Sequence, residues 1–144
     1  MGFRIEVDVR GVEAAEKKIK SLLSAVDSTD VENVMLSGAR IIKKEARGRV
    51  RGKKTGRLKR SLVAKKSKRR GNMFRSAFAA VDRKKAPHAH LYESGTVERH
   101  HRSGKSVGRM PSKPFFEPAV INKKADVERE ITNGLRRIVR GSVT

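Results

Sequence analysis

The sequence predicts an α+β domain: a small, mostly antiparallel sheet packed with helices, with a long C-terminal amphipathic helix and extended basic loops. Apolar residues recur at helical spacing in three long segments and favour strands in shorter ones. These elements do not alternate strictly, as a parallel sheet with crossover helices would require. A chain of 144 residues without an internal repeat is expected to form one domain, residues 1–144.

The first third of the chain predicts one strand and two helices. Residues 3–9 alternate apolar and charged side chains, the pattern of a half-buried strand. Residues 12–26 place apolar side chains three and four positions apart, which is typical of an amphipathic helix. Thr29 and Glu32 match a capping box, so a second helix is expected to begin there and to continue to Ala46.

One glycine of the second helix lies on its apolar side. Gly38 indicates either the close approach of another backbone or a defect that the helix tolerates at about 1 kcal/mol.

The middle of the chain predicts shorter elements. Thr55 can cap a short helix that contains Leu58 and Leu62. Residues 73–81 are apolar and strand-like, and a second strand is expected over residues 88–93.

The last third predicts a long loop and a helix. Residues 94–110 are rich in glycine and polar side chains, which indicates a loop, and we expect residues 47–56 and 95–110 to be mobile. Pro118 suits the first turn of a helix that ends near Gly141. The apolar side of that helix consists of Val127, Ile131, Leu135 and Ile138.

Positive charge is the strongest signal in the composition. Lys and Arg number 36 against 15 Asp and Glu, which gives a net charge of +21. Such an excess opposes compaction by self-repulsion and calls for an acidic partner. The basic residues concentrate between positions 43 and 70, where duplex DNA or an acidic protein surface could contact Arg47, Arg49, Arg51, Lys53, Lys54, Arg57, Lys59 and Arg60. This run lacks interleaved aromatic residues, which disfavours single-strand recognition.

Catalytic motifs are poorly supported. The segment Ser103-Gly104-Lys105-Ser106 resembles the end of a phosphate-binding loop, but Arg99 stands where that motif requires glycine. Four histidines at positions 88, 90, 100 and 101 lack the compact spacing of a metal motif, although a histidine-dependent nuclease is a third, weaker alternative. Paired carboxylates are scarce, and the chain has no cysteine. We therefore expect no enzymatic activity, no cofactor and no metal.

The chain contains no apolar run of the roughly 18 residues that a membrane span needs. The first residues also lack the apolar segment of a signal peptide. We therefore expect no membrane partner and an intracellular protein.

Three segments carry a family resemblance: Thr55 to Leu62 (TGRLKRSL), His90 to Thr96 (HLYESGT) and Pro111 to Ala119 (PSKPFFEPA). Their order and spacing resemble the neck or tail-completion family of tailed bacteriophages, typified by gene product ten of a lambdoid coliphage and related to the lambda minor tail protein Z. The resemblance covers about residues 30–140. It singles out as interface or loop residues Thr55, Gly56, Leu58, Tyr92, Glu93, Gly95, Thr96, Pro114, Phe115, Phe116 and Pro118.

The resemblance implies a virion protein of the head–tail junction, assembled in the cytoplasm of the bacterial host. It implies a homo-oligomeric ring, expected to be a hexamer, that joins a head-closure or stopper ring to a tail terminator or tail tube and lets DNA pass. One of Phe115 and Phe116 is expected in the core, and the other at an interface. The alternative function is a non-sequence-specific architectural protein that binds double-stranded DNA through residues 43–70.

Overall fold

A computed structural model describes residues 10–26, 28–51, 56–67 and 76–143. The strand predicted at residues 3–9 lies outside these ranges. The described part has an α+β fold, as the sequence predicted, with five helices and two small antiparallel sheets. In chain order the elements are α1 (Arg10–Val26), α2 (Thr29–Arg49), α3 (Arg57–Ser61), β1 (Leu62–Lys66), β2 (Ala77–Val81), α4 (Ala89–Ser94), β3 (Arg99–His100), β4 (Ser106–Gly108) and α5 (Glu117–Val143).

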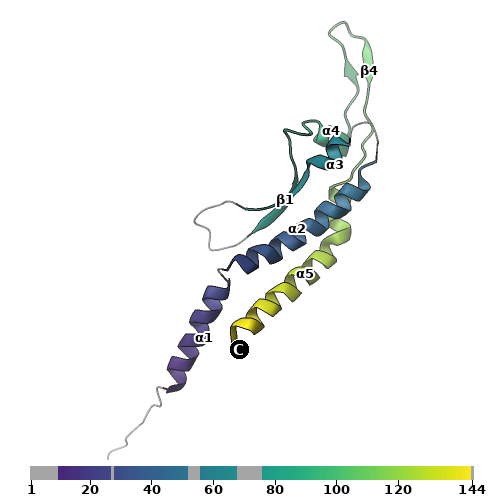
Figure 1. The fold of residues 1–144 in the computed structure, drawn as a ribbon. Coiled ribbons are helices and arrows are strands. Elements are labelled where there is room, and N and C mark those ends of the chain that lie inside the picture. Colours follow the sequence, from purple (N-terminus) through teal and green to yellow (C-terminus); the bar gives the residue numbers. More distant parts are fainter. Residues whose placement is uncertain (1–9, 27, 52–55, 68–75, 144) are drawn as a thin grey trace, which may run out of the picture.

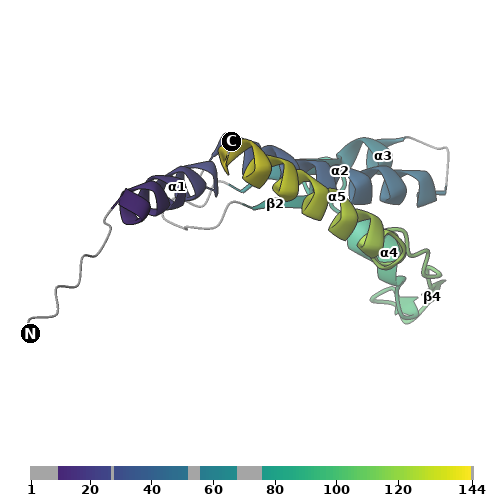
Figure 2. The same cartoon turned by 90° about the horizontal axis from the view of Figure 1, so that it is seen from below.

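Helix α2 is the central element of the fold. It packs against α5 on one side and against the β1–β2 sheet on the other, and α5 runs antiparallel to it (Figure 1). The same arrangement is visible from below, where α5 lies along α2 (Figure 2). Helix α1 extends away from one end of this body, and it contacts α5.

Glycines allow α2 and α5 to lie close together. Gly134 of α5 is buried, and a Cβ atom there would lie 2.6 Å from Cγ1 of Val34, which is shorter than any ordinary contact. On the facing helix, a Cβ at Gly38 would lie 3.1 Å from Cδ1 of Ile131. Gly38 therefore marks a close approach, and what approaches it is the side chains of α5.

The main core lies at one end of the α2–α5 pair. It consists of Ala46, Val50, Leu62, Phe115 and Ala119, with Leu58, Val81, Tyr92 and Phe116 packed against it. These residues bring together the end of α2, the start of β1, α4 and the start of α5. The core therefore joins segments that are far apart in the sequence.

Three long helices and one strand follow the sequence predictions closely. The predicted helix of residues 12–26 is α1, the second is α2, and the C-terminal one is α5. Strand β2 lies within the predicted strand of residues 73–81, of which residues 76–81 are described. The apolar positions 127, 131, 135 and 138 of α5 are all partly buried, which confirms its amphipathic face.

The short elements required corrections. The predicted strand of residues 88–93 is helix α4, since a turn of backbone hydrogen bonds runs from Leu91 and Tyr92 N–H to the His88 carbonyl. The predicted loop of residues 94–110 contains the β3–β4 hairpin. Within the basic run, residues 62–66 form strand β1, which pairs with β2 from Leu62↔Val81 to Lys66↔Ala77.

Neither of the two predicted helix caps, Thr29 and Thr55, is observed as a cap in the described residues. Helix α2 begins at Thr29, so its N-cap is Ser28 and not the predicted Thr29, and the Ser28 side chain makes no cap hydrogen bond. Helix α3 has Gly56 as its N-cap in the left-handed region, and Leu62 begins β1 instead of continuing the helix. Thr55, the predicted cap, lies outside the described residues.

Candidate functional site

Two of the segments that carry the family resemblance dock onto each other. Residues 92–96, at the end of α4 and just after it, lie against residues 110–117, which lead into α5. Lys113 N–H donates to the Tyr92 carbonyl at 2.9 Å, and Ser112 Oγ donates to the Glu93 carbonyl at 2.6 Å. We call this pair of segments the clamp.

Glu93 is the centre of the clamp. Its carboxylate accepts hydrogen bonds from the backbone N–H of Phe115 at 2.9 Å, of Phe116 at 3.1 Å and of Glu117 at 2.9 Å. Helix α5 begins at Glu117, so these donors lie at its N-terminus, where backbone N–H groups have no partner within the helix. The negative charge also lies at the positive end of the helix dipole. Glu93 therefore caps a helix that starts 24 residues later in the chain.

Gly95 allows the clamp to close. Its φ is +74°, and a Cβ atom there would lie 2.7 Å from both the Met110 carbonyl oxygen and the Ser112 nitrogen. The sharp turn at Gly95 directly follows helix α4. Thr96 continues the contact, since its N–H donates to the Met110 carbonyl and its Oγ1 accepts from the Met110 N–H, both at 2.9 Å.

Three aromatic rings fasten the clamp to the core. Phe115 is 1% exposed, and its ring packs edge-to-face against Tyr92 at 5.9 Å and against Phe116 at 6.4 Å between centroids. The Tyr92 hydroxyl donates to the Arg51 carbonyl, which ties the clamp to the end of α2. Phe115 is thus the expected core residue. Phe116 is half-buried and lines a cavity of about 490 Å³ between the end of β2, α4 and the start of α5.

The remaining resemblance residues lie around the clamp. Leu58 packs on the core, Pro114 is exposed, and Pro118 lies in the first turn of α5, as predicted. Gly56 is the N-cap of α3. The structure therefore unites the second and third segments, and places Leu58 of the first segment against the same core.

The predicted basic cluster divides into separate groups. Arg49 forms an ion pair with Glu45 at 2.8 Å and lines a cavity of about 730 Å³ together with Arg51 and Lys113. Arg57 and Arg60 line a different cavity, which they share with Lys84 and Lys85. Arg47 is exposed, Lys59 is half-buried, and Lys53 and Lys54 lie outside the described residues.

Sequence reasoning overlooked three of these cations. Lys84, Lys85 and Lys113 are distant from the basic run in the sequence, and only the chain fold brings them beside it. The antiparallel pairing of β1 with β2 is the signal that could have located Lys84 and Lys85, because it places the residues after β2 next to those before β1.

The segment that resembles a phosphate-binding loop does not have the structural context of one. Lys105 and Gly104 belong to the turn between β3 and β4, so this stretch does not enter a helix as a phosphate-binding loop must. His100 lies on β3 and His88 precedes α4. Within the described ranges, no three His, Cys, Asp or Glu side chains gather as metal ligands would. None of the helices described is long and apolar enough to cross a membrane.

The described residues thus define a small α+β protein with a modest core and a projecting hairpin. Residues 13–95 match the model of the HK97-gp10-like family of bacteriophage tail-component proteins. Because this match covers more than half of the chain, the chain belongs to the HK97-gp10-like family. No curated protein and no solved structure gave a match.

Family membership establishes a structural role in a phage tail, and with it a place in the virion. A structural tail component also favours a non-enzymatic role, in agreement with the sequence analysis. The match ends at Gly95, inside the first half of the clamp, whereas the second half lies beyond it. The hydrogen bonds of Glu93 connect the matched region to α5.

Proposed function

We propose that this tail component acts at the head–tail junction as a neck protein. Six copies form a ring that joins the head-closure or stopper ring on one side to the tail terminator or tail tube on the other, and duplex DNA passes through its centre. The observation that carries this proposal is the projecting β3–β4 hairpin, which we call the arm (residues 97–109).

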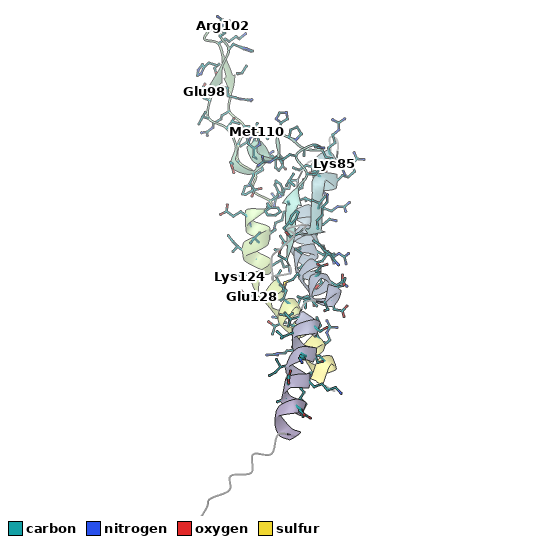
Figure 3. All side chains as sticks on the ribbon, turned by 90° about the vertical axis from the view of Figure 1, so that its left-hand side faces the viewer. Lys85, Glu98, Arg102, Met110, Lys124 and Glu128 are labelled. Carbon is teal, nitrogen blue, oxygen red and sulfur yellow. The ribbon has the colours of Figure 1, made fainter. Side chains whose placement is uncertain are left out.

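The arm has the features of a docking element. All of its residues are exposed, and Val97 is 84% exposed. Figure 3 shows Arg102 at its tip and Met110 at its base, with the arm extending away from the body. Its strands pair only at Arg99↔Gly108 and His100↔Ser106. Because an isolated two-stranded hairpin is marginally stable in water, an arm of this kind gains stability by binding a neighbour.

The charge of the arm indicates the chemistry of that neighbour. Its sequence contains four Lys or Arg residues and one acid, Glu98, which accepts a hydrogen bond from Ser106 within the arm. An acidic surface on an adjacent ring would complement this charge and steer the encounter. We assign the arm to contact with such a ring.

A second surface supports contacts between copies. Helix α1 exposes an apolar stripe in which Ile19 is 57%, Leu23 66% and Val26 53% exposed. These residues recur at helical spacing along one face of a helix that leads away from the body (Figure 1). A neighbouring subunit that covers this stripe would bury apolar area. This burial would favour association and offset the repulsion between subunits that each carry a net charge of +21.

The arm can be tested without disturbing the clamp. Replacing residues 98–108 by Asn-Gly retains the Thr96–Met110 hydrogen bonds and closes the chain with a two-residue turn. We expect phage carrying this variant to produce DNA-filled heads and complete tails that do not join, as seen by electron microscopy, together with a loss of infectivity. A control variant, Arg102→Gln with Lys105→Gln, keeps the arm and tests whether its charge or its shape is required.

Two results would count against the neck proposal. Infectious particles at normal yield would show that the arm makes no required contact. Purified protein that binds any duplex in a salt-sensitive way, and that never assembles with tail components in measurements of mass and shape, would favour the architectural DNA-binding alternative.

A further inference from the structure

A pocket lined by four cations lies beside the core. Arg57 and Arg60 of α3, and Lys84 and Lys85 of the turn after β2, line a cavity of about 370 Å³. We call it the cationic pocket. All four residues are exposed, and Figure 3 shows Lys85 projecting outward from the body.

The sheet holds the two sides of this pocket in place. Helix α3 runs directly into β1, and the turn of residues 83–85 directly follows β2. Because β1 and β2 are antiparallel, with Leu62 opposite Val81, the two segments emerge at the same end of the sheet. Asp82 N–H donates to the Ser61 carbonyl at 2.7 Å, and Ser61 is fully buried. The sheet therefore fixes the backbone positions of the four cationic residues relative to one another.

Asp82 is the acid that the structure places beside the two lysines of the pocket. Asp82 lies 4.0 Å from Lys85, whose side chain remains 59% exposed, and it accepts the Lys84 backbone N–H in the turn. Arg57 and Arg60 also interact with other groups of the chain, so the inference does not require unpaired guanidinium groups. It requires only that four positive charges line one exposed concavity.

We infer that the cationic pocket binds phosphate groups of duplex DNA. Four neighbouring cations suit a ligand with closely spaced charges, and duplex DNA carries one about every 1.7 Å along its axis. Arginine forks match the paired oxygens of a phosphate, and lysine adds point charge. Among the described residues, no aromatic side chain lines the pocket, so it would read the DNA backbone and not the bases.

This inference deepens the proposed neck role, because a neck ring surrounds DNA, but DNA binding can be measured on the isolated protein. Helix α5 has 27 residues and is about 40 Å long, a height over which duplex DNA presents roughly 24 phosphates. A ring of six copies would therefore face enough phosphates for every copy to contact several.

The test uses a pair of variants with equal charge. The pocket variant carries Arg57→Gln, Arg60→Gln, Lys84→Gln and Lys85→Gln. The control variant carries Lys17→Gln, Lys18→Gln, Arg136→Gln and Arg137→Gln, four exposed cations on α1 and the C-terminal half of α5, away from the pocket (Figure 1). Each variant loses two Lys and two Arg, so both change the net charge from +21 by four.

Binding of the full chain to a 30-base-pair duplex is measured by fluorescence anisotropy over a series of salt concentrations. The slope of log K against log salt falls by about 0.9 for each phosphate that the protein no longer neutralises. We expect the magnitude of this slope to decrease by about 2 to 4 in the pocket variant and by less than about 1 in the control variant. Equal losses in the two variants would overturn the inference, because they would show that total charge alone governs binding.

Two further measurements complete the test. A Lys84→Gln, Lys85→Gln double variant changes only the turn, so it preserves α3 and is expected to lose a slope of about 1 to 2. If the pocket variants bind DNA normally but lose binding to poly-glutamate, the ligand is an acidic protein and the DNA inference is wrong. If the pocket variant loses DNA affinity while the arm replacement leaves the phage infectious, the pocket inference stands and the neck proposal fails.

Discussion

Replacement of Glu93 tests whether one carboxylate organises the start of α5. In the Glu93→Ala protein, three backbone N–H groups lose their acceptor, and the N–H of Phe115 belongs to a residue only 1% exposed. A hydrogen bond to a charged group contributes about 1.5–3 kcal/mol, and bonds that share one acceptor are not additive. We therefore expect Glu93→Ala to lower the free energy of unfolding by about 3 kcal/mol.

That loss is measurable by thermal unfolding followed by circular dichroism. A chain of 144 residues has an unfolding entropy of about 300 cal/mol/K, so 1 kcal/mol corresponds to about 3 °C in Tm. Glu93→Ala should lower Tm by about 10 °C. Glu93→Gln keeps an acceptor oxygen and loses only the charge, so it should lower Tm by about 3–7 °C.

Glu128→Ala is the control, because Glu128 belongs to α5 itself and does not cap its N-terminus. It lies 4.0 Å from Lys124, and both side chains are more than 60% exposed (Figure 3). An exposed pair of this kind contributes about 0.3–0.5 kcal/mol, so Tm should shift by no more than about 2 °C. Equal shifts in Glu93→Ala and Glu128→Ala would refute the capping role. Faster hydrogen exchange at the Phe116 and Glu117 amides in Glu93→Ala alone would distinguish a lost cap from general loosening.

Two further predictions concern the clamp and α5. Gly95→Ala should lower the free energy of unfolding by at least about 2 kcal/mol in denaturant titrations. Gly104 has φ +80° and open space around it, so Gly104→Ala should cost only the backbone strain of about 1 kcal/mol. Similar losses in the two variants would contradict the close approach at Gly95. The Lys123 ammonium donates a hydrogen bond to Asp126 at 2.7 Å and, with its charge, holds the pKa of Asp126 below 3.8. This pair should therefore stabilise the fold above pH 3.8 and lose its effect as pH falls through the lowered pKa, and an NMR titration midpoint at or above 3.8 would contradict it.

The long helices could be predicted because periodicity over many residues is a strong signal. Helix α5 repeats its apolar side chains through several turns, and no other structure satisfies that spacing. Helix α4 has only six residues, over which helical and strand patterns are hard to distinguish. Its conformation depends on distant contacts, such as the hydrogen bond from Lys113 N–H to Tyr92 and the packing of Tyr92 on Phe115.

Strand β1 and the arm were missed for different reasons. Residues 62–66 end in two lysines inside a run of basic residues. These charged residues made the sequence pattern of the strand hard to recognise, although its first residue is buried. The arm has no apolar alternation, because all of its residues are exposed and none packs on the body. The capping role of Glu93 had no local signal either, since a carboxylate and the helix it caps can be related only through the fold.

Two of the three proposed contact regions, the apolar stripe of α1 and the cationic pocket, lie at opposite ends of α2, and their separation bears on how a chain of such high positive charge could associate. The apolar stripe of α1 precedes the start of α2, and the cationic pocket lies near its end, about 30 Å away along a 21-residue helix. Subunits that associate through α1 would keep their cationic pockets away from that interface. At this separation, the charges of the pocket are largely screened from the α1 interface at physiological ionic strength. DNA bound in the cationic pockets would neutralise the positive charge at that end of the subunit. The proposed ring of subunits with a net charge of +21 would then be most stable where counter-charge is present, which is the condition that a junction with DNA passing through it would meet.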